Sequence, residues 1–367
     1  MLTRDSWNSI VKATSYPHFL QSWEWSEIKQ AQNWTPLFKY WQKNNTIQAC
    51  AMILTKAIQL PLTPFKALIG YIPKGPLLNW TDLDCREETI DSIQETAKEK
   101  HYIYIKIDPD VVLGSGIPGT DQERQEKTGI DVCENLSKRG WRYSNDQIQF
   151  KNTVVLDLSQ SEDEIMSRMK QKNRYNIRLA ERKGITIDDA DPEDFSLLYK
   201  MYAATSIRDN FVIRSEQYYQ RVWKIFLEHN MAKFLVAYFD HKPIAALFLV
   251  YFGQTAWYFY GMSLSEYREK MPNHLLQWHA ILEAKKQNCI RYDLWGAPDI
   301  FDASDPMWGV YRFKEGFNGN VIRTIGAWDY PVYPQLYTFY TNLMPRIMNY
   351  FRKRGIAQTK RTLAGMS

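Results

Sequence analysis

The chain has 367 residues, of which 45% are hydrophobic and 24% are charged, so it is long enough for about two domains of ordinary globular composition. Its four cysteines are scattered and show no ligand spacing, which excludes a disulfide-rich scaffold and a cysteine-based metal site. The formal net charge is +5, and since no acidic residue follows Asp329, the surplus lies in a basic tail.

The N-terminal half opens on polar sequence without a secretory signal, and no apolar run reaches the roughly 20 residues of a membrane span. We expect a cytoplasmic protein. A helix is predicted over 21–31, then a hairpin of strands 35–41 and 47–54 around Lys43-Asn44-Asn45. Strand 65–72, helix 82–100 and strand 101–107 follow, and the last strand stops at Asp108-Pro109. The glycine-rich stretch 114–129 is predicted as a loop.

The C-terminal half repeats this order. Ser161 and Glu164 form a capping box that begins a helix through Lys183, and helices 193–207 and 215–229 come next. A hairpin of strands 234–239 and 244–252, strand 255–260, helix 273–286 and strand 289–294 complete the series. Corresponding elements lie roughly 200 residues apart, so the sequence predicts two copies of one mixed α/β unit.

The stretch from Arg291 to Asp329 combines a short strand, a break at Gly296, an Asp- and Pro-rich loop, and a helical turn with Lys314 among aromatic residues. A lysine there has a long apolar stem to bury and an ammonium to aim, which predicts the edge of an active site. From Leu336 to Phe351 the apolar spacing indicates an amphipathic helix, for which core packing is favoured over contact with a membrane.

Several motifs along the chain together resemble the FemABX family. They are F-K-x-G-F at 313–317, G-x-W-D at 326–329, M-K-Q-K-N-R-Y-N-I-R at 169–178, Y-x-Y-G-x-S at 258–263, I-D-P at 107–109 and W-x-x-x-K at 25–29. Enzymes of this family transfer amino acids from aminoacyl-tRNA to peptidoglycan precursors.

The resemblance implies an α/β fold of two tandem GNAT-like domains with the active site between them. The first domain would comprise 1–152 plus 326–367, the precursor side, and the second 153–325, the tRNA side. No heptad-rich pair of long helices is present in the sequence, so we expect the form without a coiled-coil arm.

Transfer from an activated ester requires an oriented amine and stabilisation of the oxyanion or leaving hydroxyl, and it needs no metal. By resemblance, Lys314 is expected to meet the ester and Phe313 to contact the terminal adenosine. The alternative for Lys314 is a surface lysine between core aromatics. Asp108 is expected to bind the incoming amine or peptide stem, and a plain strand-ending turn is the alternative.

The precursor diphosphate is expected to bind Lys29 and Arg214, since the family motifs W-x-x-x-K and F-x-x-R-x-x-x-Y-Y fall there and Arg suits phosphate. Solvated charges at helix ends are the alternative. Strand alternation predicts Tyr258 and Tyr260 on one face, where they would contact substrate or form a buried cross-strand pair.

Four basic residues spaced by four form a cationic stripe on the predicted helix: Lys170, Arg174, Arg178 and Arg182. Binding of tRNA and simple solvation of a helix face are both consistent with this stripe. His274 and His279 are five residues apart, which is not the spacing of a helical metal pair.

The sequence therefore predicts an aminoacyltransferase that uses aminoacyl-tRNA as co-substrate, has no cofactor or metal, and extends the stem peptide of UDP-MurNAc-pentapeptide or lipid II. For its basic tail, a contact with the inner membrane surface or with RNA is one interpretation, and a solvated, partly frayed chain end is the favoured alternative. Two alternatives are an acyl-CoA-dependent N-acyltransferase and a non-catalytic tRNA-binding module. The only R-x-x-G-x-A pyrophosphate-binding string, at 352–357, follows a helix instead of a strand, which disfavours the first.

Overall fold

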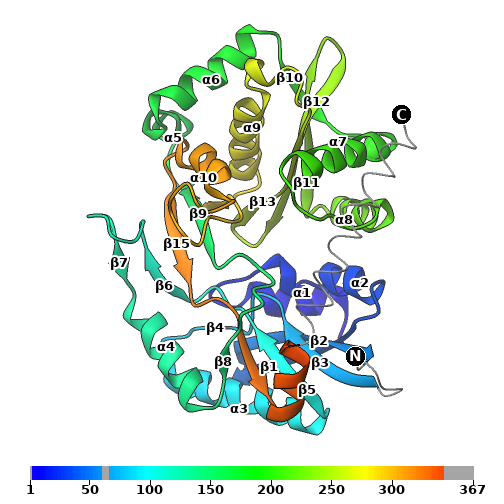
Figure 1. Cartoon of the computed structure of the whole chain (residues 1–367), viewed down its shortest axis with the longest axis vertical. Helices are drawn as coiled ribbons and strands as arrows, with labels where there is room; N and C mark the ends of the chain where they lie inside the picture. The colour runs from blue at the N-terminus through cyan, green and yellow to red at the C-terminus, as the bar shows by residue number, and fades with distance from the viewer. Residues whose placement is uncertain (1, 60–65, 343–367) are drawn as a thin grey trace. The chain divides into compact units, whose positions relative to one another are not determined.

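The computed structural model describes residues 2–59 and 66–342, which divide into two compact units. Unit 1 contains the described residues of 2–154, 296–309 and 320–342, and unit 2 contains 155–295 and 310–319 (Figure 1). Most of the predicted helix over 336–351, the basic residues of the tail and the R-x-x-G-x-A string lie outside the described residues.

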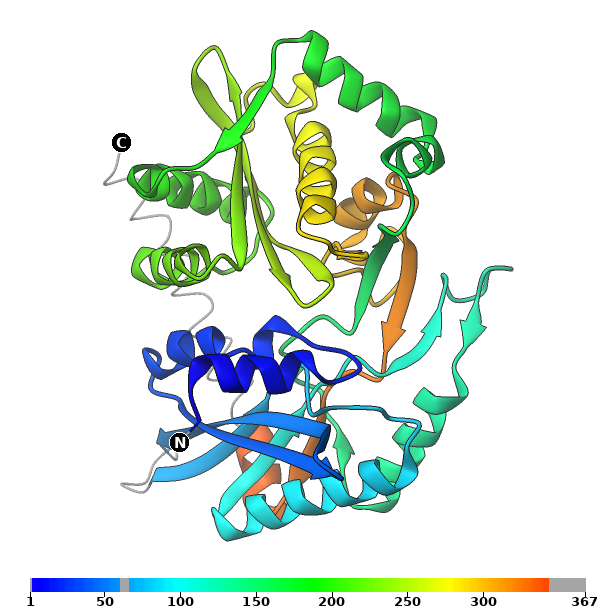
Figure 2. The ribbon, with the colours of Figure 1, turned by 180° about the vertical axis from the view of Figure 1, so that it is seen from behind.

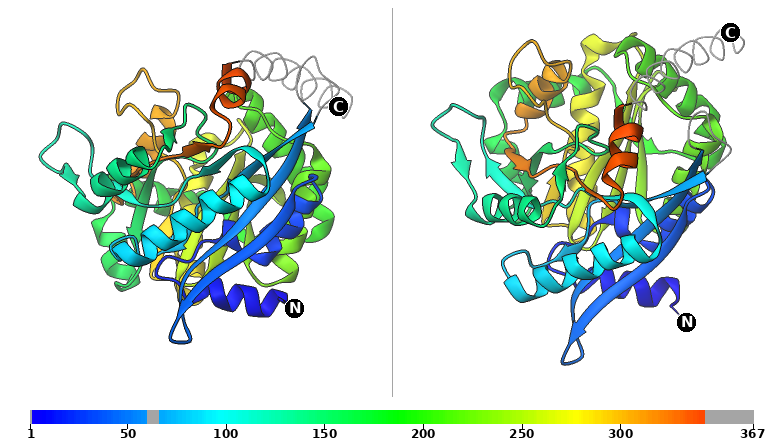
Figure 3. Two further views of the ribbon diagram at one scale, coloured as in Figure 1. Left: turned by 90° about the horizontal axis from the view of Figure 1, so that it is seen from below. Right: turned by 60° about the horizontal axis from the view of Figure 1, so that its bottom comes forward.

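Unit 1 is built on a mixed sheet. Strands β1 (Thr35–Lys43), β2 (Thr46–Gln59) and β3 (Lys66–Ile72) are antiparallel, and β5 (Tyr102–Ile107) pairs parallel with β3 after helix α3 (Leu83–Glu99). The β1–β2 turn has positive φ at Asn44 and Asn45, the conformation that hairpin turns require. β16 (Trp328–Pro331) pairs antiparallel with β5, and β8 (Arg142–Tyr143) with β16. Helix α3 lies along the sheet (Figure 3).

The core of unit 1 lies between this sheet and its helices. Fully buried side chains from β2, α3 and β5 meet there, among them Ile53, Ile90 and Ile105. Three further short elements belong to the N-terminal part of unit 1: α1 (Arg4–Lys12), α2 (Trp23–Gln30) and β4 (Leu77–Leu78). The amphipathic patterning of α3 is thus explained by one face that packs on the sheet.

The stretch predicted as a loop, 114–129, has neither helix nor strand over 116–123, so the prediction is confirmed for its middle and is wrong for both ends. β6 (Val112–Ser115) pairs with β7 (Arg124–Gln125) and β15 (Asn320–Thr324), and α4 (Lys127–Lys138) follows. A Cβ at Gly114 would lie 2.5 Å from the Arg124 carbonyl oxygen, and one at Gly129 would lie 2.3 Å from that of Val112. These glycines allow close backbone approach, which composition does not distinguish from a loop.

Unit 2 repeats the order of unit 1. Strands β11 (Ala232–Phe239), β12 (Lys242–Phe252) and β13 (Thr255–Ser263) are antiparallel, and after α9 (Pro272–Lys286) β14 (Arg291–Asp293) pairs parallel with β13. β9 (Asn152–Asp157) pairs antiparallel with β14, as β16 does with β5, and β10 (Thr186–Asp189) pairs with β11. The predicted repeat of a mixed α/β unit is confirmed.

The two faces of the sheet in unit 2 carry different helices. α9 covers one face, and α7 (Phe195–Arg208) and α8 (Glu216–Glu228) cover the other (Figures 1 and 2). A side chain on β13 therefore belongs either to the α9 side or to the α7–α8 side, and this division decides which residues meet.

The single helix predicted from Ser161 to Lys183 is two helices, α5 (Glu162–Arg168) and α6 (Gln171–Arg182). Between them Met169 and Lys170 are extended, with ψ of 150° and 142°. The Lys170 amide donates to the Gly316 carbonyl at 3.0 Å, and the Arg174 guanidinium donates to the Ser167 carbonyl at 2.9 Å. A tertiary contact and a side-chain cap thus replace the helical hydrogen bonds.

The longest helix among the described residues is α3, with 17 residues, and a pair of long helices that would form a coiled-coil arm is absent from them. Within the same ranges, none of the helices has the length and apolarity needed to cross a membrane.

Candidate functional site

Lys314 lies at the end of α10 (Trp308–Glu315), the helical turn of the F-K-x-G-F motif, in unit 2. Its side chain is only 2% exposed. The ammonium donates to the Trp295 carbonyl at 2.7 Å and lies 5.9 Å from the centroid of the Tyr258 ring. The alternative of a surface lysine is therefore wrong, because the charged end itself is buried.

Burial lowers the pKa of Lys314 to about 7, while the nearby Asp293 carboxylate opposes this shift. Desolvation disfavours the charged ammonium, and an acidic neighbour restores part of its stability. A lysine with this pKa exchanges a proton near neutral pH, which suits an acid or base of the reaction.

Tyr258, whose ring lies beside the Lys314 ammonium, is on β13. Burial raises the pKa of Tyr258 to about 12, and the nearby Gln277 side chain of α9 opposes this rise. Gln277 is 1% exposed and accepts a hydrogen bond of 2.8 Å from the fully buried Tyr292 hydroxyl. A Cβ at Gly261 would lie 1.7 Å from the Tyr258 hydroxyl oxygen, so only glycine leaves room for this hydroxyl.

The prediction that Tyr258 and Tyr260 share one face is wrong. Phe248 pairs with Tyr260 but its neighbour Leu249 pairs with Tyr258, so Phe259 is the extra residue of a β-bulge. A bulge shifts the alternation by one residue, and the two tyrosines lie on opposite faces. Tyr258 faces Gln277 of α9, whereas the Tyr260 ring lies among tyrosines of α7 and α8.

Arg214 lies two residues before the start of α8 and is exposed. Its guanidinium lies 4.9 Å from the Tyr218 ring centroid, and its backbone carbonyl accepts from the Tyr199 hydroxyl at 3.1 Å. Tyr260 joins this cluster, with its ring 5.3 Å from that of Tyr219. The structure thus brings Arg214 and Tyr260 together, and it places them on the other face of the sheet from Tyr258.

Two of the motifs are in direct contact in unit 2. The Lys170 ammonium pairs with Glu315 at 2.7 Å, and a Cβ at Gly316 would lie 2.2 Å from the Asn173 amide oxygen. The Phe313 ring lies 5.1 Å from the ring of His274, and Asn176 contacts that histidine at 3.2 Å. Burial lowers the pKa of His274 to about 4, so it is neutral at physiological pH. These contacts fix the turn that carries Phe313 and Lys314.

The cationic stripe is divided by these contacts. Lys170 pairs with Glu315, and Arg174 is half-buried and caps α5 through its carbonyls. Arg178 and Arg182 are exposed, the latter with its guanidinium 5.7 Å from the Tyr175 ring centroid. Arg174 therefore has a structural role, whereas Lys170, Arg178 and Arg182 are all exposed, the first of them in an ion pair with Glu315.

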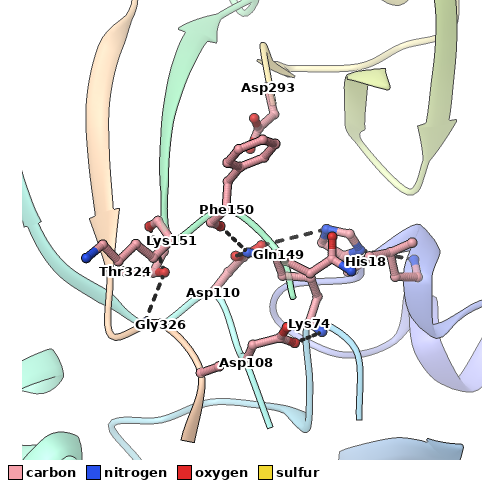
Figure 4. A network of polar contacts seen from close by, with 12 residues as sticks. His18, Lys74, Asp108, Asp110, Gln149, Phe150, Lys151, Asp293, Thr324 and Gly326 are labelled. Atoms are coloured by element: carbon pink, nitrogen blue, oxygen red, sulfur yellow. Dashed lines mark hydrogen bonds and ion pairs between the residues drawn. The ribbon is translucent and has the colours of Figure 1, made fainter. Parts of the chain in front are cut away.

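Asp108, in unit 1, follows β5 and is 3% exposed. It accepts a hydrogen bond from the Lys74 amide at 2.6 Å (Figure 4). It also accepts one from the Tyr71 hydroxyl at 2.7 Å. Burial raises its pKa to about 6, and the charge of Lys74 opposes this rise. Asp108 is therefore part of a buried polar network, which a plain strand-ending turn would not require.

Sequence reasoning missed the rest of this network. The Lys74 ammonium pairs with Asp110 at 2.8 Å and donates to the Phe150 carbonyl at 3.1 Å, and the His18 ring lies 3.8 Å from Asp110 (Figure 4). Gln149 contacts the Tyr71 hydroxyl at 3.2 Å. The sequence offered two signals for this network: Asp110, two residues beyond Asp108, and the break at Pro73-Lys74-Gly75-Pro76.

Lys29, on α2 in unit 1, is half-buried, and its ammonium lies 4.5 Å from the centroid of the Trp25 ring. Both residues belong to the W-x-x-x-K motif, whose i, i+4 spacing places them on one side of the helix. The structure thus explains the spacing by a cation–π contact within α2.

The aspartate of G-x-W-D has a structural task. Asp329, on β16, is 2% exposed, lies 3.1 Å from the Lys106 ammonium and accepts from the Tyr337 hydroxyl at 2.9 Å. This buried pair joins β16 to β5 in unit 1. Among the residues the structure describes, no group of three or more His, Cys, Asp or Glu side chains is arranged to hold a metal ion.

Comparison with known proteins identifies relatives along most of the chain. The sequence model of the FemAB family matches residues 2–242 and 240–344. A lipid II:glycine glycyltransferase of Staphylococcus aureus (strain MRSA252) is 22% identical, over 94% of this chain and 96% of that protein. The corresponding protein of strain USA300 is 21% identical over the same shares.

Among solved structures, FemX superposes with a TM-score of 0.80 and 21% identity, over 93% of this chain and 99% of that chain. A conserved protein of unknown function from Bacteroides thetaiotaomicron gives a TM-score of 0.55 at 10% identity. The predicted fold class, two tandem GNAT-like α/β domains, is confirmed by the likeness to FemX. The predicted enzyme class, an aminoacyltransferase, is confirmed by the family and by the names of the relatives. With its family model matched over most of its length, this chain belongs to the FemAB family.

Proposed function

We propose that this protein transfers an amino acid from aminoacyl-tRNA to the stem peptide of a peptidoglycan precursor, either UDP-MurNAc-pentapeptide or lipid II. Family membership and relatives named as lipid II:glycine glycyltransferases support this substrate class. The observation that carries the proposal is Lys314, a buried lysine with a pKa of about 7 in the F-K-x-G-F turn.

In the proposed reaction the stem-peptide amine attacks the ester carbonyl of aminoacyl-tRNA. A C–N bond forms, the C–O bond to the terminal ribose breaks, and the amine proton ends on the ribose hydroxyl. Lys314, when protonated, stabilises the carbonyl oxygen as it gains charge and supplies a proton to the leaving oxygen. Phe313 provides an apolar surface for the terminal adenosine, and Tyr258 contacts the reacting ester.

Unit 1 is proposed to hold the acceptor through Asp108 and Lys29, the former at the amine and the latter at the diphosphate. Arg214 and Tyr260 are proposed to contact the precursor from unit 2, since a guanidinium beside tyrosines fits a phosphate and a sugar. Arg178 and Arg182 are proposed to contact the tRNA, while Lys170 contacts the turn that carries Lys314 and Arg174 caps α5.

A panel of charged tRNAs mixed with either precursor, with products followed by mass spectrometry, tests the proposal. The expected result is an acceptor heavier by one amino-acid residue, and absence of product with every charged tRNA would refute it. Acetyl-CoA with the same acceptors is the parallel arm for an acyl-CoA enzyme. Filter binding with Arg178→Glu/Arg182→Glu is expected to show weaker tRNA binding and a shallower salt dependence.

The proposed acceptors carry a diphosphate, and lipid II would place the reaction at a membrane surface. A separate measurement of rates with the two precursors, one soluble and one in vesicles, identifies the acceptor. Equal rates at equal concentrations would show that the lipid is not recognised.

A further inference from the structure

The turn after β14 connects Asp293 to Lys314 through the backbone of Trp295. We propose that Asp293 is a positioning residue, which uses this turn to hold the Lys314 ammonium where it meets the reacting ester. Asp293 acts through Trp295 and does not itself contact the substrate. This role rests on the proposed aminoacyl transfer, and Asp293 lies outside the motifs that predicted Lys314 and Tyr258.

Two hydrogen bonds form the connection, and the chemistry of their groups fixes both directions. The Trp295 amide donates to the Asp293 carboxylate at 2.8 Å, and the Lys314 ammonium donates to the Trp295 carbonyl at 2.7 Å. An ammonium and a backbone N–H can only donate, and a carbonyl oxygen can only accept. Asp293 and Lys314 are 5% and 2% exposed, so both charged groups depend on protein partners.

The backbone at Trp295 has a conformation that needs support. Its φ is 54°, in the left-handed region, and Gly296 follows with a φ of 92°. A positive φ is uncommon for a bulky residue, and such a residue keeps it only where its surroundings hold it. An aspartate that accepts from the amide two residues further on closes an Asx-turn, which supplies this support. The direction of the Trp295 carbonyl, and with it the place of the ammonium, therefore depends on Asp293.

The Trp295 ring is held from a second side. Phe259, the extra residue of the bulge in β13, lies with its ring 5.4 Å from the Trp295 ring at an interplanar angle of 83°. A bulge turns one side chain of a strand in a new direction. Tyr258, the residue before it, has its ring centroid 5.9 Å from the Lys314 ammonium. The bulge and the turn after β14 thus fix the ammonium and the ring beside it together.

Two substitutions separate the turn from the charge of Asp293. Asp293→Asn keeps an oxygen that can accept from the Trp295 amide, and it loses the charge. Asp293→Glu keeps the charge, but one more methylene carries its carboxylate away from that amide. The separation is necessary because the carboxylate also acts on Lys314 through its charge, by opposing the fall in the lysine pKa.

The experiment measures kcat and KM of the full-length protein with the charged tRNA and precursor identified by the panel, near pH 6, where the wild-type lysine is charged. Asp293→Ala and Asp293→Glu are expected to lower kcat at least about tenfold with little change in KM, since a misplacement of about 1 Å can cost about 10²-fold. Asp293→Asn is expected to stay within about threefold of the wild-type kcat, because the turn is kept. If Asp293→Asn loses as much as Asp293→Ala, the turn is not the cause and the proposal is overturned.

Asp157→Ala is the matched control in the same unit. Asp157, at the end of β9, accepts from the Ser159 amide at 2.9 Å with the same two-residue spacing, but it is exposed and the proposed reaction does not use it. This variant loses an equivalent turn bond and is expected to keep its kcat. An equal loss of kcat in Asp157→Ala and Asp293→Ala would overturn the positioning role, because any such turn would then have the same effect.

A double-mutant cycle with Lys314→Met separates positioning from a structural role. If Asp293 acts through Lys314, adding Asp293→Ala to Lys314→Met changes the residual kcat by less than about twofold, because the group it positions is gone. A loss of the same factor in both backgrounds overturns the proposal. If the residual rate of Lys314→Met is below detection, the comparison of Asp293→Asn with Asp293→Glu decides alone.

The wild-type protein separates this role from the proposed function. If the wild type forms no product with any charged tRNA, the proposed function fails. If the wild type is active and Asp293→Ala keeps its kcat, the proposed function stands and the role of Asp293 is refuted.

Discussion

Replacement of Lys314 by Met is expected to abolish transfer and yet to stabilise the fold in a pH-dependent way. The lysine is 2% exposed, and burial lowers its pKa from 10.5 to about 7. The unfolded chain therefore binds more protons than the folded one between these values, and wild-type stability rises with pH there. Below pH 7 the folded protein holds a buried charge, and the full free-energy cost of that charge is present.

The size of this stability cost follows from the change in the pKa of Lys314. About 3.5 pKa units at 1.36 kcal/mol each give a cost of about 5 kcal/mol near pH 6, and the same linkage leaves about 2 kcal/mol near pH 9. In the variant the Trp295 carbonyl and the Asp293 carboxylate lose their cation, at about 1–3 kcal/mol. Lys314→Met is therefore expected to be more stable by about 2–4 kcal/mol near pH 6 and about equal near pH 9.

Urea unfolding at both pH values, followed by tryptophan fluorescence, measures the difference, and the transfer assay measures the loss of activity, expected at about 10²–10³. Lys106→Met is the matched control, because Lys106 is also 2% exposed but pairs with Asp329 at 3.1 Å. That variant leaves a buried carboxylate without its partner and is expected to lose about 3–5 kcal/mol at both pH values. A Lys314→Met variant whose stability relative to wild type is the same at both pH values would refute the reasoning.

Three further predictions concern neighbouring residues. Gly261→Ala is expected to lower kcat about as much as Tyr258→Phe, with both measured in the transfer assay, because its Cβ would lie 1.7 Å from the Tyr258 hydroxyl. Gly316→Ala is expected to lower the melting temperature by displacing Asn173, 2.2 Å from the added Cβ, and unchanged melting would contradict this packing. Because burial raises the pKa of Asp108 from 3.8 to about 6, the wild type loses stability as the pH rises through this range. The free energy of unfolding of Asp108→Asn, measured in urea, should therefore gain up to about 3 kcal/mol relative to wild type between about pH 4 and pH 7.

The elements that carry the repeat could be read from the sequence because their signals are local. The turn at Asn44-Asn45 and the apolar run of β12 need only neighbouring residues to be recognised. Lys314 and Asp108 were predicted as site residues, the first by its motif and the second by its I-D-P motif at the end of a strand, and the structure shows both to be buried.

Other parts of the site could not be predicted, because their causes lie far away in the chain. The helix break at Met169 depends on a hydrogen bond from Lys170 to Gly316. The hydrogen bonds of Lys74 and Gln277 depend on partners that folding brings in from distant parts of the chain.

The sequence by itself determined the order of strands and helices, the family, and the type of residue available for chemistry, because periodicity, turn chemistry and motif spacing are properties of short segments. Only the tertiary structure decided that Lys314 is buried, that a bulge at Phe259 separates Tyr258 from Tyr260, and that Lys170 pairs with Glu315 while Arg174 caps α5. Burial and hydrogen-bond direction depend on what surrounds a side chain, and those surroundings come from segments that the chain brings together only on folding.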